Sequence, residues 1–105
     1  MKIKIQNILD ATKGKLVHGN PDTIIEGIST DSRVIQESDL FVALKGEKFD
    51  GHDFLCQVAQ KGAIGAVVSD PVDVDLPIII EVDDTLHAYG DMANLHRKKF
   101  DIPVV

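Results

Sequence analysis

Residues 27–33, GISTDSR, bring several side chains that could bind a ligand together directly after a run of apolar residues. Thr30 and Ser32 carry hydroxyls, which donate and accept hydrogen bonds, and Arg33 carries a guanidinium whose fixed fork suits phosphate or carboxylate. A simple turn would use the same residues, with Asp31 and Ser32 bonded to the nearby backbone and Arg33 in solvent. Composition alone favours the turn, because such clusters are common where a chain reverses direction.

A second polar segment, residues 45–51 (KGEKFDG), follows the apolar run Phe41–Leu44. Its two glycines permit positive φ angles and let the backbone approach a ligand closely. Lys45 and Lys48 would balance phosphate charge, and Phe49 would cover a flat base. The competing interpretation is a connecting loop whose phenylalanine folds back onto the core, since single aromatic residues at a surface are ordinary.

Other groups of polar residues predict no catalytic or metal site. His52 and Cys56 have the spacing to share a metal on a helix, but a structural zinc site needs four ligands and no second pair completes it. Cys56 is instead expected to be a small buried side chain. The acids Asp70, Asp73 and Asp75 lack the spacing of a calcium loop. The phosphate-binding pattern G-x-x-x-x-G-K-[ST] is absent from the sequence.

The apolar and turn-forming residues predict the elements that position these segments. Apolar spacing of three and four residues predicts helices over 5–12, 52–61 and 83–100. Apolar and β-branched runs predict strands over 15–18, 23–29, 39–44, 64–69, 77–82 and 102–105. Strand and helix alternate in the second half, which indicates an α/β fold. Both polar segments then follow strands, where open α/β sheets bind ligands.

Some details of these elements can be compared directly with a structure. Gly14 and Gly62 are expected to end the first two helices, and Asp50 or Asp53 to cap the start of the second. The strand over 39–44 is expected to be buried on both faces, because its residues are mostly apolar. The inward face of the last helix is predicted to consist of Leu86, Tyr89, Ala93 and His96.

Length, charge and cysteine content limit the class of protein. The chain has 105 residues, the size of one domain, and its 44% hydrophobic and 27% charged residues indicate a globular protein. The formal net charge is -6 and the densest basic run is Arg97–Lys99, which excludes nucleic acid as the main partner. No segment has the apolar length of a signal peptide or a membrane span. With one cysteine and no membrane contact, a cytoplasmic protein is expected.

Residues 27–54, GISTDSRVIQESDLFVALKGEKFDGHDF, resemble the amino-terminal domain of the Mur ligases of bacterial cell-wall synthesis. The resemblance continues through 62–70 (GAIGAVVSD) and 82–105 (VDDTLHAYGDMANLHRKKFDIPVV), while the first two dozen residues match only loosely. The DSR triplet alone is a weak signal, whereas its spacing to DLFVALKGEKFDGHDF is specific. The chain is most similar to the branch that adds D-alanyl-D-alanine to the UDP-linked muramyl tripeptide. The branch that adds the third amino acid is the alternative.

The resemblance implies a fold, a ligand and a set of contacts. The family's first domain has a small mixed, largely parallel sheet flanked by helices, and it holds the UDP end of the UDP-N-acetylmuramoyl peptide. The positions that match the family's nucleotide contacts are Thr30, Ser32, Arg33, Glu47, Lys48 and Phe49. For Arg33, a structural role as a partner of Asp31 is the alternative. No catalytic residue and no metal ligand is implied within this chain.

The resemblance also implies that residues 1–105 are the first domain of a longer ligase, cut just before its central ATPase domain. In the family, the strand that matches Ile102–Val105 leads into a phosphate-binding loop, and the full-length enzyme uses ATP and magnesium. The 105 residues alone are then expected to be inactive and monomeric. Their partners would be the UDP-muramyl peptide and the central and C-terminal domains of the same chain.

Two rival functions use the same fold. A stand-alone UDP-sugar binding module would bind its ligand without ligation, and a protein-interaction domain would bind no nucleotide at all. In the second case, changes at Ser32 and Phe49 would be harmless. Changes at Ile28 or Phe41 would unfold any of these proteins by opening cavities in the core.

Overall fold

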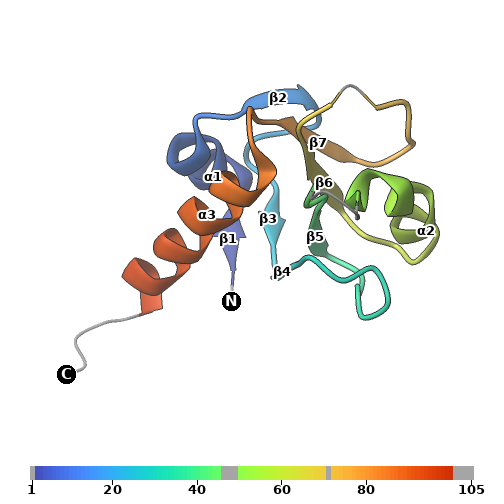
Figure 1. Ribbon diagram of the computed structural model, residues 1–105. Coiled ribbons are helices and arrows are strands. Elements are labelled where there is room, and N and C mark those ends of the chain that lie inside the picture. The colour runs from blue at the N-terminus through green and yellow to red at the C-terminus, as the bar shows by residue number, and fades with distance from the viewer. Residues whose placement is uncertain (1, 46–49, 71, 101–105) are drawn as a thin grey trace.

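A five-stranded sheet forms the centre of the protein in this computed structural model, which describes residues 2–45, 50–70 and 72–100, with side chains up to residue 94 (Figure 1). The strands lie in the order β2 (Lys15–His18), β7 (Ile78–Glu81), β6 (Gly65–Val68), β5 (Asp39–Val42) and β4 (Gly27–Ser29). β2 runs antiparallel to β7, and the other neighbours run parallel. The predicted α/β class, with a small mixed and largely parallel sheet, is confirmed.

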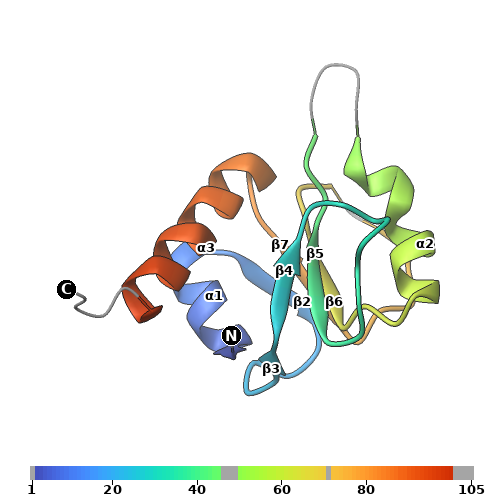
Figure 2. The ribbon, with the colours of Figure 1, turned by 90° about the horizontal axis from the view of Figure 1, so that it is seen from below.

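Helices cover both faces of this sheet, so the fold has three layers (Figure 2). α1 (Ile5–Thr12) and α3 (Thr85–Phe100) contribute to the apolar cluster on one face. The 3-10 turn η1 (Gly51–Phe54) and α2 (Leu55–Gln60) lie on the other face, and α2 contributes to the cluster there. Within the described ranges, no helix has the length and apolar character needed to cross a membrane.

The residues of β5 and the one that follows it alternate between the two apolar clusters. Leu40 and Val42 belong to the cluster on the side of α1 and α3, whereas Phe41 and Ala43 belong to the cluster on the side of α2. All four residues are fully buried. The predicted burial of this strand on both faces is confirmed, and it follows from side chains that point to opposite faces at successive positions.

The single strand predicted over 23–29 is wrong, because two short strands replace it. β3 (Ile24–Ile25) pairs antiparallel with β1 (Ile3–Lys4) in a separate two-stranded sheet, whereas β4 pairs parallel with β5. Between them, the backbone N–H of Glu26 donates to the carbonyl oxygen of Ser38 at 3.0 Å. The two halves of the apolar run therefore have different pairing partners, and pairing partners are not encoded in local periodicity.

Two of the three predicted helix ends agree with the structure. Gly62 has φ +91°, as expected after α2, and the Asp50 side chain caps η1 by accepting the backbone N–H of His52. After α1, however, the left-handed position belongs to Lys13 at φ 58°, so the prediction for Gly14 is wrong. A Cβ on Gly14 would lie 2.9 Å from Ile80 Cγ2, so close packing explains this glycine.

The predicted inward face of α3 is wrong by about one residue position. Thr85, Ala88 and Met92 are buried, whereas Leu86 is 62% exposed and Tyr89 is 37% exposed. Ala88 and Met92 belong to the apolar cluster to which α1 and the sheet also contribute. The strand predicted over 102–105 and the side chain of His96 lie outside what the structure describes.

Candidate functional site

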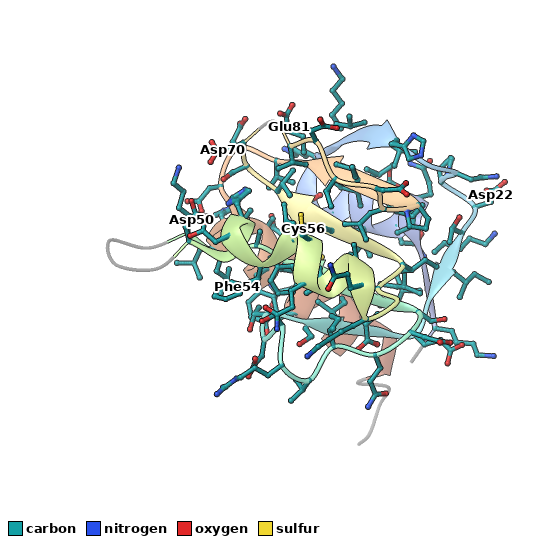
Figure 3. The ribbon with its side chains drawn as sticks, turned by 90° about the vertical axis from the view of Figure 1, so that its right-hand side faces the viewer. Asp22, Asp50, Phe54, Cys56, Asp70 and Glu81 are labelled. Carbon is teal, nitrogen blue, oxygen red and sulfur yellow. The ribbon has the colours of Figure 1, made fainter. Side chains whose placement is uncertain are left out.

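β4, β5, β6 and β7 are parallel, so their carboxyl ends lie side by side. These ends form what is here called the carboxyl edge of the sheet. Residues 30–33 follow β4 at this edge, and Lys45 follows β5. Figure 3 shows Asp50 and Asp70 close together at this end of the molecule, far from the turn that contains Asp22. The two polar segments predicted to be functional therefore start at the edge where open α/β sheets bind ligands.

A cleft of about 490 Å³ lies at this edge of the sheet. Its lining residues are Thr30, Asp31, Ser32, Arg33, Leu44 and Phe54. The structure thus brings the three predicted contacts of the first segment together beside two apolar side chains, Leu44 and Phe54. Both side chains are partly buried against the two apolar clusters and also line this cleft. Their positions just after β5 and just before α2 could have indicated the cleft.

The first polar segment is a hydrogen-bonded turn. The Ser29 hydroxyl oxygen accepts the backbone N–H of Asp31 at 3.1 Å. Arg33 donates to the Asp31 carboxylate three times, from its backbone N at 2.9 Å and from Nε and Nη2 at 3.0 and 2.9 Å. The structural role considered for Arg33, as a partner of Asp31, is therefore present in the folded chain.

Ser32 and Arg33 are also held from the end of α2, through a contact that the sequence did not reveal. Lys61 Nζ donates to the carbonyl oxygens of Ser32 and Arg33, at 2.9 and 3.3 Å. Ser32 itself is only 7% exposed, whereas the Arg33 side chain is 83% exposed. The turn therefore presents a fixed backbone, one nearly buried hydroxyl and one guanidinium that reaches into solvent.

Replacing Arg33 by glutamine is expected to raise the pKa of Asp31. The side-chain and backbone hydrogen bonds from Arg33 lower this pKa from its ordinary 3.8 to about 2. In Arg33→Gln the backbone donor stays, so the pKa should rise but remain below 3.8. An acid titration of the Asp31 carboxyl carbon by NMR measures it, and an unchanged pKa would contradict the ion pair. Because folding depresses this pKa, the pair stabilises the fold above pH 3.8, and that contribution is lost as the pH falls towards 2.

The base of the second polar segment is tied to the connection that follows β6. Lys45 and Asp50 form an antiparallel bridge. Lys45 Nζ lies 3.0 Å from Asp70 Oδ2, and this hydrogen bond raises the pKa of Lys45. The other predicted contacts, Glu47, Lys48 and Phe49, come between Lys45 and Asp50 in the sequence and are outside the residues that the structure describes.

His52 joins Asp50 to Ser69 through both nitrogens of its ring. Nε2 accepts the backbone N–H of Ser69 at 3.1 Å, so this nitrogen carries no proton. Nδ1 must then carry the ring proton and donate it to Asp50 Oδ1, 2.6 Å away. The same carboxylate oxygen accepts the backbone N–H of His52 at 2.9 Å, and these hydrogen bonds lower the pKa of Asp50.

The cluster around His52 does not need a metal ion. Ligand atoms of Asp50, His52 and Asp70 lie within 4.8 Å of one another. Both ring nitrogens of His52 are hydrogen-bonded, however, and Asp70 is paired with Lys45.

The prediction that Cys56 is a buried side chain is wrong, because this residue is exposed on α2 (Figure 3).

Comparison with known proteins identifies relatives along the whole chain. A family model described as "Mur ligase family, catalytic domain" matches residues 24–97. The UDP-N-acetylmuramoyl-tripeptide--D-alanyl-D-alanine ligase of Escherichia coli (strain K12) is 38% identical over 105 residues, which cover 100% of this chain and 23% of that protein. The UDP-N-acetylmuramoyl-L-alanyl-D-glutamate--2,6-diaminopimelate ligase of Halalkalibacterium halodurans is 37% identical over 93 residues, which cover 87% of this chain and 18% of that protein.

Solved structures show the same fold. A crystal structure of MurF from Acinetobacter baumannii matches with a TM-score of 0.86 and 36% identity, covering 94% of this chain and 22% of that one. MurF from Thermotoga maritima, in complex with ADP, matches with a TM-score of 0.62 and 28% identity, covering 71% of this chain and 17% of that one. The chain therefore spans less than a quarter of the length of these relatives.

Proposed function

The chain belongs to the Mur ligase family, and from this premise we propose that it binds the UDP end of UDP-N-acetylmuramoyl-tripeptide, for the ATP-dependent ligation of D-alanyl-D-alanine in peptidoglycan biosynthesis. The tripeptide ligases of E. coli and Bacillus subtilis match 100% of the chain, at 38% and 35% identity. The diaminopimelate ligase of H. halodurans matches 87% of it. Addition of the third amino acid to the UDP-linked dipeptide is therefore the second candidate.

The observation that carries this proposal is the combination of polar and apolar groups in the cleft. Leu44 and Phe54 offer an apolar wall for a flat base, and the hydroxyls of Thr30 and Ser32 suit sugar or phosphate oxygens. Arg33 binds Asp31 through Nε and Nη2, so Nη1 points away from that carboxylate and suits a diphosphate. From the adjoining loop, the proposed contacts are Glu47, Lys48 and Phe49.

In the proposed mechanism this domain positions the substrate and contributes no catalytic residue. A complete ligase uses ATP and magnesium to activate the terminal carboxylate of the peptide for attack by the amine of D-alanyl-D-alanine. The cleft holds the UDP group far from that carboxylate, so that remote binding energy fixes the reacting group and lowers the barrier. As the first domain of such a cytoplasmic ligase, residues 1–105 alone bind substrate as a monomer and form no amide bond.

An NMR titration with UDP-N-acetylmuramoyl-tripeptide tests the proposal, with UDP-glucose as a second ligand. Chemical shift changes confined to residues 30–33, Leu44, 45–51 and Phe54 would support it. A response to both ligands would assign recognition to the UDP group. Changes centred elsewhere on the sheet, or none at millimolar ligand in a full-length ligase, would overturn it.

Ser32→Ala is expected to weaken UDP binding without unfolding the protein. Loss of one hydrogen bond to the ligand costs roughly 1 kcal/mol, which corresponds to about fivefold weaker binding. Thr23→Ala is the control, because it also removes a side-chain hydroxyl. Thr23 follows Asp22, which lies far from the end of the molecule that holds Asp50 and Asp70 (Figure 3). Isothermal titration measures both variants. Equal affinity of Ser32→Ala and the unmodified chain would contradict the assigned hydrogen bond to the ligand. No measurable binding of UDP by either chain would favour a protein-interaction domain that binds no nucleotide.

A further inference from the structure

Two neighbouring peptide groups, which join Ser32 to Arg33 and Arg33 to Val34, are each held from two sides. A trans peptide group is planar, and its carbonyl oxygen and its N–H point in opposite directions. On the carbonyl side, Lys61 Nζ donates to the Ser32 oxygen at 2.9 Å and to the Arg33 oxygen at 3.3 Å. On the other side, the N–H of Arg33 donates to Asp31 Oδ1 at 2.9 Å, and the N–H of Val34 donates to the Asp31 carbonyl oxygen at 3.3 Å. Lys61 and Asp31 together therefore fix the orientation of both peptide planes.

The Lys61 contact also ties this turn to α2. Asp31 lies within the turn itself, whereas Lys61 directly follows α2 and is 29 residues from Ser32 in the sequence. Its ammonium suits two carbonyl oxygens, because it carries three N–H donors and no acceptor. Phe54, which lines the cleft, directly precedes α2. Since only this short helix separates Phe54 from Lys61, the contact fixes the position of the turn relative to the apolar wall of the cleft.

The attachment of this segment to the core does not depend on Lys61. Ile35, two residues after Arg33, is 6% exposed and belongs to the apolar cluster on the side of α2, together with Leu55 and Val58. Lys61 is exposed, and one hydrogen bond at the surface supplies only a small part of the stability of a domain. Removing the ammonium should therefore release the two peptide groups without unfolding the protein.

We propose that Lys61 is a positioning residue for the UDP-linked substrate, which it does not touch, because it holds Ser32 and Arg33 in the orientation that binds the ligand. This inference rests on the proposed function, in which Ser32 and Arg33 contact the UDP group. The described residues that line the cleft do not include Lys61. The Ser32 hydroxyl is one bond from Cβ, so its place in the cleft follows the backbone. Groups that are fixed before the ligand arrives lose less freedom on binding.

Lys61→Met tests this proposal, because methionine has a similar length and no N–H donor. In NMR spectra of the 105-residue chain without ligand, the carbonyl carbons of Ser32 and Arg33 should shift, since they report hydrogen bonds to their oxygens. The melting temperature should fall by no more than about 5 °C. Isothermal titration of the native full-length protein with UDP-N-acetylmuramoyl-tripeptide should give about fivefold weaker binding, because a turn that spends about one fifth of its time in the binding orientation raises Kd by that factor.

Two further variants separate positioning from a general effect of charge. Lys61→Arg should restore the affinity to within about twofold, because a guanidinium also offers several N–H donors and no acceptor. Lys15→Met removes the same charge from β2, and β2 and β4 are the two outer strands of the five-stranded sheet. The affinity of Lys15→Met should stay within about twofold of the unmodified protein, because salt screens a charge over that distance.

The other outcomes overturn the proposal. Unmoved carbonyl carbons in Lys61→Met would mean that the contact is absent, and moved carbons with unchanged affinity would make Lys61 a structural residue only. Unfolding of Lys61→Met would have the same meaning. Equal weakening by Lys15→Met, or no recovery in Lys61→Arg, would assign the effect to charge or to lysine itself. Absence of binding by the unmodified full-length protein would instead overturn the proposed function, and this inference with it.

Discussion

Phe41→Ala is expected to lower the free energy of unfolding by about 3–5 kcal/mol. Phe41 is fully buried in β5, and its ring belongs to the apolar cluster between the sheet and α2. Its backbone pairs with Ser29 on one side and Ala66 on the other. These ladders keep the neighbouring strands in place, so the cavity left by the ring can collapse only partly. Urea denaturation followed by circular dichroism measures the loss.

The matched control for this cavity is Val34→Ala. Val34 is 61% exposed, so removing its two methyl groups should change the free energy of unfolding by less than about 0.5 kcal/mol. A domain of this size has a total stability of about 5–15 kcal/mol, which makes the loss at Phe41 easy to detect. A loss of under about 1 kcal/mol at Phe41 would contradict the packing described for β5.

Gly51→Ala is expected to destabilise the protein by about 1–3 kcal/mol and to displace η1. A Cβ on Gly51 would lie 2.8 Å from Ala43 Cα and 2.8 Å from Leu44 N, closer than such atoms approach in proteins. Both contacts are with backbone, which cannot rotate away as a side chain does. The shift that relieves them would pull on Asp50 and His52, which lie on either side of Gly51.

Two measurements identify this effect. Thermal unfolding gives the loss of stability, and NMR of the His52 ring reports whether Nε2 still accepts the Ser69 N–H. Gly90→Ala is the matched control, because a Cβ on Gly90 meets nothing within 4 Å and alanine favours a helix interior by about 1 kcal/mol over glycine. Replacing glycine by alanine should therefore stabilise the protein at position 90 and destabilise it at position 51. Unchanged stability and His52 signals in Gly51→Ala would contradict the close approach.

Some features of the fold could be predicted because they depend on neighbours in the sequence. β2 has the predicted bounds. The helix predicted over 5–12 is α1, and its residues Ile5 and Ile8 are buried. Apolar spacing identifies the buried side of an element when only one side is apolar, as in α1. The Asp50 cap could also be predicted from the sequence, because its acceptor and its donor are only two residues apart.

The candidate site could be predicted in part. The chemical types of Thr30, Ser32 and Arg33 made them candidates for ligand binding, although composition alone favoured a simple turn. The resemblance to the Mur ligases implied UDP as the ligand, and this assignment stays a prediction. The side chains that complete the cleft or hold the turn come from other elements. Lys61, for example, is 29 residues from Ser32 in the sequence. Such a contact leaves no local pattern, because it depends on how α2 lies on the sheet.

The type and order of most elements follow from the amino-acid sequence alone, because local backbone preference and apolar period act over a few residues. The pairing partner of each strand and the buried side of α3 depend instead on packing between distant parts of the chain. On α3 the stripe with Ala88 and the stripe with Leu86 both have helical spacing, so periodicity cannot choose between them. Close packing against α1 and the sheet selects the side with the small Ala88, and Leu86 is left facing outward.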